Sequence, residues 1–338
     1  MERAPFSQAG LRPEEINKES ALLLKSLDAA KEVVSEIDFQ VVDDIFFNIY
    51  KKLYPEIPPG DIKRTFQLEG VYPVHVTYSG EVDLSHYGSS FMNSQGRVLG
   101  YRYLLQKLKI NAREVVNEQG EIDEEMRLFL VKMLIHEIVH IRTTKAFKGL
   151  LPNTLDEHTG IEKKSMNTQS KITGVGSFSS LNEALTEIIA DGIYSEYFAR
   201  TGRMKEYEAA SREIDFAKRQ LGYVPERLAL QNLVDKIARD LNVSEREIYQ
   251  ALAVEYFKNG DLMRSEILSD PSLSNEVKQL LEQLHRDDPS SFPSLSEDQE
   301  SKISTFLHKK ELAAVKALVG RDYIGEVNKA RLVRSGVK

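Results

Sequence analysis

Hydrophobic and polar positions divide the chain into helical segments on either side of a region with strand character. Between Asn17 and Tyr54 apolar residues recur at helical spacing, which predicts helix. Residues 70 to 110 alternate in part and are rich in β-branched and aromatic side chains, which predicts a β-sheet. From Leu181 onward the pattern is helical almost throughout, with a break at 287–296. The predicted fold class is therefore α+β.

A central, buried helix is predicted directly after the sheet region. Asp123 is a suitable N-cap for it, and Gly149 and Pro152 mark its far end. The residues between are apolar on most sides, as in a helix that is covered by other elements. The polar segment 151–180 that follows is predicted to be a long loop.

Three regions follow from these elements. We expect an N-terminal helical region at 1–60, an α+β core at 61–224 that includes the long loop 151–180, and a C-terminal helical region at 225–338. A chain of 338 residues is long enough to bury a substantial core in this way.

Composition excludes several classes of function. The chain has no cysteine, so disulfides, thiolate metal sites and a cysteine nucleophile are excluded. A net charge of −7 argues against a nucleic-acid partner. Neither a secretory signal at the N-terminus nor an apolar run long enough to span a membrane is visible, so the expected location is cytoplasmic and no membrane partner is expected.

The chemistry lies in the sequence His136-Glu137-Ile138-Val139-His140 inside the predicted central helix. Two histidines four residues apart lie on one face of a helix, where both can bind one metal ion. Glu137 is placed next to that ion, where a carboxylate can take a proton from water. Two packed core histidines would be costly without partners for their ring nitrogens. The pattern therefore predicts one zinc ion bound by His136 and His140.

A zinc site that performs catalysis needs a third protein ligand. The metzincin pattern is excluded, because Thr143 and Ala146 stand where it requires glycine and histidine. The remaining candidates lie downstream in the sequence: Asp156, Glu157, His158, Glu162 and Glu183.

The segment Leu181-Asn182-Glu183-Ala184-Leu185-Thr186-Glu187, taken with the histidine pattern, resembles the gluzincin peptidases. The resemblance covers the two helices that carry these residues. It implies a zincin-like core in which Glu183 is the third zinc ligand and Glu187 orients the first histidine. The alternative for Glu183 is a capping box with Ser180, in which the carboxylate only bonds back to the start of its own helix.

Further residues are assigned roles near the predicted metal. Asp191 continues the helix face of Glu183 and Glu187, either as a second acid behind the metal or as a solvated charge. In the families that the chain resembles, a tyrosine or histidine beyond the third ligand donates to the oxyanion. Tyr223 is the preferred candidate here, and Tyr194 and Tyr197 are the alternatives. Residues 107–113 are a candidate edge strand for binding an extended substrate.

The predicted function is a zinc metallopeptidase, a hydrolase that acts on a peptide or protein substrate with Glu137 as general base. One alternative is a catalytically silent, zincin-fold protein that binds or regulates a partner. The other is a helical interaction protein in which the histidine pattern is accidental.

Overall fold

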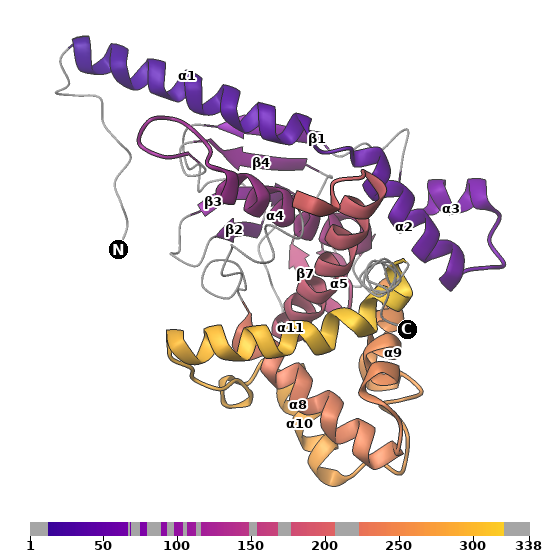
Figure 1. The fold of residues 1–338 in the computed structure, drawn as a ribbon. Helices are drawn as coiled ribbons and strands as arrows, with labels where there is room; N and C mark the ends of the chain where they lie inside the picture. The colour runs from indigo at the N-terminus through magenta and orange to yellow at the C-terminus, as the bar shows by residue number, and fades with distance from the viewer. Residues whose placement is uncertain are drawn as a thin grey trace, which may run out of the picture. The chain divides into compact units, whose positions relative to one another are not determined.

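The computed structural model describes residues 13–66, 68, 75–79, 89–92, 98–103, 107–112, 116–148, 154–167, 177–206 and 223–320 (Figure 1). The chain divides into two compact units. Unit 1 consists of Met1–Ile37 and His75–Val131, and unit 2 of Asp38–Val74 and Lys132–Lys338. No helix among the described residues is both long and apolar enough to cross a membrane.

The described part of unit 1 contains a helix, a four-stranded sheet and the start of a second helix. Its elements are α1 (Pro13–Ser35), β1 (His75–Ser79), β2 (Ser89–Met92), β3 (Val98–Tyr103), β4 (Lys107–Asn111) and the first two turns of α4 (Glu124–Thr143). The strand order is β1-β4-β3-β2, with β1 and β4 parallel and the other pairs antiparallel. The sheet that the pattern predicted between residues 70 and 110 is thus present in the described part of that range.

The prediction of an edge strand at 107–113 is wrong. β4 covers the described part of that segment, and it is hydrogen-bonded to β1 on one side and to β3 on the other. With both sides paired, its backbone has no free row of N–H and C=O groups to offer an extended peptide. Sequence alternation identifies a strand, but it does not say which neighbours the strand has.

Unit 2 is mainly helical, with a small second sheet. Its elements are α2 (Phe39–Leu53), α3 (Pro59–Thr65), the rest of α4, β5 (Thr144–Lys148), β6 (Thr154–Thr159), β7 (Glu162–Asn167), α5 (Ser179–Arg200), α8 (Val224–Leu241), α9 (Glu245–Lys258), the 3₁₀ turns η1 (Leu262–Arg264) and η2 (Pro289–Ser291), α10 (Asn275–His285) and α11 (Glu297–Val319). Helix α5 contacts α2, α8, α9 and α11.

Helix α5 forms the centre of unit 2. Every residue from Ala184 to Phe198 is buried, on all faces of the helix. Each large apolar side chain buried in this way contributes about 1.5–3 kcal/mol. The same helix buries the carboxylates of Glu187, Asp191 and Glu196, which requires partners for their charges.

The structure agrees with the α+β class, and the predicted N-terminal helix needs correction. The helix predicted from Asn17 to Tyr54 is two helices, because the Asp38 carboxylate accepts the N–H groups of Gln40 and Val41 and so starts a new helix. The capping box that the sequence predicts for Ser244 and Glu247 is present at the start of α9.

The central helix α4 begins where the sequence predicts and ends earlier. The Asp123 carboxylate accepts the N–H of Met126 at 2.7 Å, as an N-cap does. The helix ends at Thr143, and the hydroxyls of Thr143 and Thr144 donate to the carbonyls of Val139 (2.8 Å) and His140 (2.6 Å). These bonds satisfy carbonyls of the last turn, and strand β5 starts at Thr144.

The long loop predicted at 151–180 is also wrong in part. β6 and β7 lie inside it, and β6 pairs with β5 on one side and with β7 on the other in an antiparallel sheet of order β5-β6-β7. Gly160 makes the turn between β6 and β7 with φ of +58°, a conformation that glycine adopts without strain. Residues 151–153 and 168–176 of the predicted loop lie outside the described residues.

Candidate metal centre

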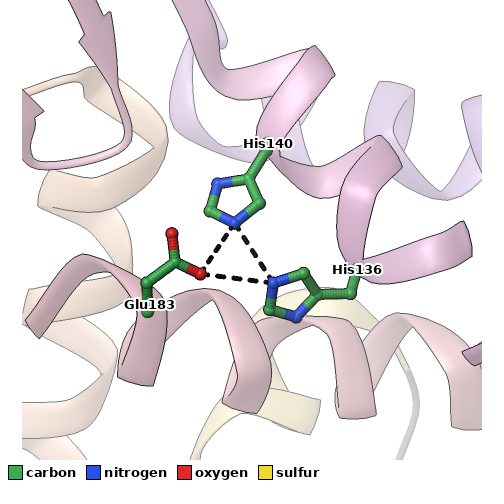
Figure 2. A group of neighbouring side chains, drawn as sticks. All are labelled: His136, His140 and Glu183. Carbon is green, nitrogen blue, oxygen red and sulfur yellow. Dashed lines mark hydrogen bonds and ion pairs between the residues drawn. The ribbon is translucent and has the colours of Figure 1, made fainter. Parts of the chain in front are cut away.

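Two helices of unit 2 bring three ligand atoms together. Helix α4 carries His136 and His140, and α5 carries Glu183 (Figure 2). The Nε2 atoms of the two histidines are 3.1 Å apart, and Glu183 Oε2 lies 3.1 Å from His140 Nε2 and 3.4 Å from His136 Nε2. Among the described residues these three form the only group with the donor atoms and spacing to hold a metal ion.

The spacing fits one tetrahedral ion. Zinc binds histidine nitrogen and carboxylate oxygen at about 2.0–2.2 Å, so neighbouring ligand atoms in a tetrahedral site lie about 3.3–3.6 Å apart. Of the three distances between the ligand atoms, 3.4 Å falls in that range and the two of 3.1 Å fall just below it. Both imidazole rings are nearly completely buried, while the Glu183 side chain keeps 21% exposure. Glu183 is therefore the one of the three ligand side chains that reaches solvent to an appreciable extent.

Glu187 fixes the orientation of the His136 ring. His136 Nδ1 lies 2.8 Å from Glu187 Oε2, and a carboxylate can only accept, so Nδ1 carries a proton and Nε2 is the ring nitrogen that faces the other two ligands. Burial alone would lower the pKa of His136, but the hydrogen bonds to Glu183 and Glu187 outweigh it and raise that pKa to about 10. The site thus strongly favours a positive charge.

Glu183 lies in the first turns of α5, and its carboxylate is not engaged in a capping box. The helix begins after Phe178, whose φ of 60° places it in the left-handed region and whose side chain offers no cap. Instead the Asp287 carboxylate accepts the N–H groups of Ser179 (3.0 Å) and Ser180 (2.8 Å). Glu183 is therefore free to point at the histidines. Burial raises its pKa, but the two neighbouring imidazoles outweigh burial and hold the pKa well below its usual range.

Asn182, beside Glu183, ties the second sheet to the same helix. Its Oδ1 accepts the N–H of Ile161 at 3.1 Å, next to the turn at Gly160. Asn259, which ends α9, donates to the carbonyls of Thr143 (2.6 Å) and Gly160 (3.1 Å). The buried turn at Gly160 and Ile161 thus links the end of α4 to the start of α5. These bonds fix the positions of the two ligand-bearing helices relative to each other.

Among the described side chains, Glu162 and His158 are the other candidates for the third ligand, and neither joins the two histidines. Glu162 is buried in β7, and His158 lies in β6; neither belongs to the metal-holding group. The side chains of Asp156 and Glu157 lie outside the described part of the structure.

Tyr223 lies next to the ligand triangle, the name used here for His136 Nε2, His140 Nε2 and Glu183 Oε2. Its ring is parallel to that of His136, within 5°, with 6.2 Å between ring centroids, and 38% of the residue is exposed. Burial and the negative charges of Glu183 and Glu137 raise the pKa of Tyr223, so its hydroxyl keeps its proton at neutral pH. Glu137, 5% exposed, is close enough to affect both Tyr223 and His136 electrostatically.

The two alternative tyrosines belong to the core. Tyr197 is fully buried, and its hydroxyl accepts the N–H of Asp38 at 3.1 Å. Tyr194 is 1% exposed and packs against Phe198. Tyr194 and Tyr197 therefore lie in the core. Of the three candidate tyrosines, Tyr223 is the one beside the ligand triangle.

Sequence reasoning missed Lys132. Its Nζ lies 2.6 Å from Glu187 Oε1 and 2.8 Å from Asp191 Oδ1, and only 1% of its side chain is exposed. Asp191 is thus a buried partner of this lysine and not a solvated charge. A lysine one turn before His136 on an otherwise apolar helix was the available signal.

A scan against protein-family models, a search of curated proteins and a search of solved structures each found no match to this chain.

Proposed function

We propose that this protein is a zinc-dependent metallopeptidase with a zincin-like core of the gluzincin type. The observation that carries the proposal is the meeting of His136 Nε2, His140 Nε2 and Glu183 Oε2 at the spacing of ligands on one ion. Two imidazoles and one carboxylate suit zinc, whereas calcium and magnesium prefer oxygen ligands alone. An open fourth position distinguishes catalytic zinc sites from structural ones.

Each residue beside the triangle has a role in this proposal. Zinc, when bound, would supply a Lewis acid that polarises the substrate carbonyl and makes water more acidic. Glu137 takes a proton from the water as its oxygen attacks the carbonyl carbon, and delivers that proton to the amine nitrogen as the C–N bond breaks. The protonated Tyr223 hydroxyl donates to the oxyanion that forms on the former carbonyl oxygen.

The reaction is tested with a mixed peptide library and detection of new termini by mass spectrometry. We expect the zinc-loaded protein to cleave peptides, and Glu137→Gln to bind zinc without cleaving them. Glu266→Gln makes the same change at an exposed glutamate of unit 2 and should cleave like the wild type.

Two outcomes would contradict the proposal in different ways. Cleavage that persists in Glu137→Gln would remove Glu137 as the general base. Stoichiometric zinc without cleavage of any peptide would favour the catalytically silent, zincin-fold binding protein.

A further inference from the structure

Behind the ligand triangle, charged side chains alternate between the two helices. On α4 the residues are Lys132, His136 and His140, and on α5 they are Glu183, Glu187 and Asp191. Members of each set are four residues apart, and the contacts run in opposite order along the two helices. Asp191 and Glu187 contact Lys132, Glu187 and Glu183 contact His136, and Glu183 contacts His140.

Lys132 is the only ammonium group in this series, and it is deeply buried. A lysine is almost never fully buried unless it is paired. Burial disfavours its charge, but the carboxylates of Asp191 and Glu187 outweigh burial, so the pKa of Lys132 is raised. The same ion pair and the hydrogen bond to His136 outweigh burial at Glu187 and lower its pKa.

The geometry divides the two oxygens of Glu187 between two partners. Oε1 contacts Lys132 Nζ at 2.6 Å, and Oε2 contacts His136 Nδ1 at 2.8 Å. Since a carboxylate is planar, fixing one oxygen also fixes where the other points. Asp191 supports the arrangement from the next turn, because its Oδ1 holds Lys132 while its Oδ2 lies 3.3 Å from His308 Nδ1 on α11.

We propose that Lys132 is a positioning residue for the metal centre: by holding Glu187 Oε1 it aims Oε2 at His136 Nδ1 and so turns His136 Nε2 toward the other ligands. The inference rests on the metal site proposed above, and it extends that site by one further layer of residues. Removal of a hydrogen-bond acceptor that orients a metal-bound histidine commonly lowers the metal affinity 10- to 100-fold. Lys132 acts through such an acceptor, Glu187.

Lys132→Met alone leaves two buried carboxylates without their cation, and a failure to fold would then hide the effect. We therefore compare Lys132→Met/Asp191→Asn with Asp191→Asn. The double variant removes one positive and one negative charge together, so the net charge of the buried group stays as in the wild type. Asp191→Asn keeps the contact between Lys132 and Glu187. The double variant differs from it by that contact and by one positive charge, and the wild type is the reference with the same net charge as the double variant.

Two measurements separate positioning from a merely structural role. The first is zinc affinity by competition with a chelator, where we expect the double variant to bind about 10-fold more weakly than Asp191→Asn. The second is the downfield proton NMR signal of His136 Nδ1–H in the metal-free protein. It should be present in the wild type and in Asp191→Asn, and exchange-broadened or absent in the double variant.

The results that would overturn the role of Lys132 differ from those that would overturn the metal site. Equal zinc affinity in both variants, with the His136 Nδ1 proton retained, would overturn the role of Lys132 and leave the metal site intact. Failure of the wild type to bind zinc would overturn the metal site, and the proton signal, which needs no metal, would still decide whether Lys132 positions His136.

Discussion

Helix α5 has its N-terminal cap supplied by Asp287, which is distant in sequence, and removing that cap should destabilise the protein measurably. The Asp287 carboxylate accepts two main-chain N–H groups, at 3.0 Å from Ser179 and 2.8 Å from Ser180. Neither Phe178 nor any acidic residue in the first turn of α5 provides a substitute. Asp287 itself has φ of 50°, so Asp287→Gly removes the carboxylate and is compatible with the backbone.

The magnitude follows from these contacts. Loss of an N-cap costs about 0.5–2 kcal/mol, and loss of a negative charge at a helix N-terminus about 0.3–1 kcal/mol more. The relief of strain at a positive φ and the greater freedom of glycine in the unfolded chain offset each other to a first approximation. We expect the free energy of unfolding to fall by about 2 kcal/mol in Asp287→Gly.

Urea unfolding followed by circular dichroism measures this change. Asp287→Asn is the matched control: its amide oxygen can still accept one N–H, and asparagine tolerates a positive φ, so it should lose less than the glycine variant. A change within about 0.5 kcal/mol for Asp287→Gly, the range of ordinary surface substitutions, would refute the assignment of Asp287 as the cap of α5.

Three further predictions concern single side chains. Gly160→Ala should destabilise by more than about 2 kcal/mol in urea unfolding, because φ is +58° and the new Cβ would lie 2.2 Å from a ring carbon of Tyr256; wild-type stability would contradict the turn geometry. If the proposed reaction occurs, Tyr223→Phe should lower kcat about 100-fold with little change in KM, and an unchanged kcat would exclude its hydroxyl as the oxyanion donor. Burial opposes the charge of Asp191, but Lys132 outweighs burial and holds the Asp191 pKa far below its usual range, so this group stabilises the fold above about pH 4 and its contribution is lost as the pH falls. Asp191→Asn should therefore show a shallower loss of unfolding free energy from pH 5 to pH 3 than the wild type, and equal slopes would contradict the pairing.

Local patterns identified the parts of the site that depend on helix periodicity. The four-residue spacing of His136 and His140, and of Glu183 and Glu187, reports which side chains share a helix face. In the structure both glutamates contact His136, Glu183 near Nε2 and Glu187 at Nδ1. The Asp123 cap is equally local, since its partner is three residues away. Such features are visible in sequence because a helix fixes the geometry between near neighbours.

The features that the sequence did not reveal depend on distant partners. Asp287 caps a helix that starts more than one hundred residues earlier, whereas the capping box between Ser180 and Glu183 is an alternative that the sequence alone leaves open. β6 and β7 are polar, and their strand character comes from the pairing of β6 with β5 and with β7. Lys132 resembles an isolated charge until Glu187 and Asp191 are brought to it.

The most direct test of the proposed metal centre is a crystal of the zinc-loaded protein measured on both sides of the zinc absorption edge. The anomalous difference map should contain one strong peak about 2.0–2.2 Å from His136 Nε2, His140 Nε2 and Glu183 Oε2. A map with no peak between these three atoms, or with zinc bound only elsewhere on the chain, would contradict the metal centre and with it the proposed hydrolysis.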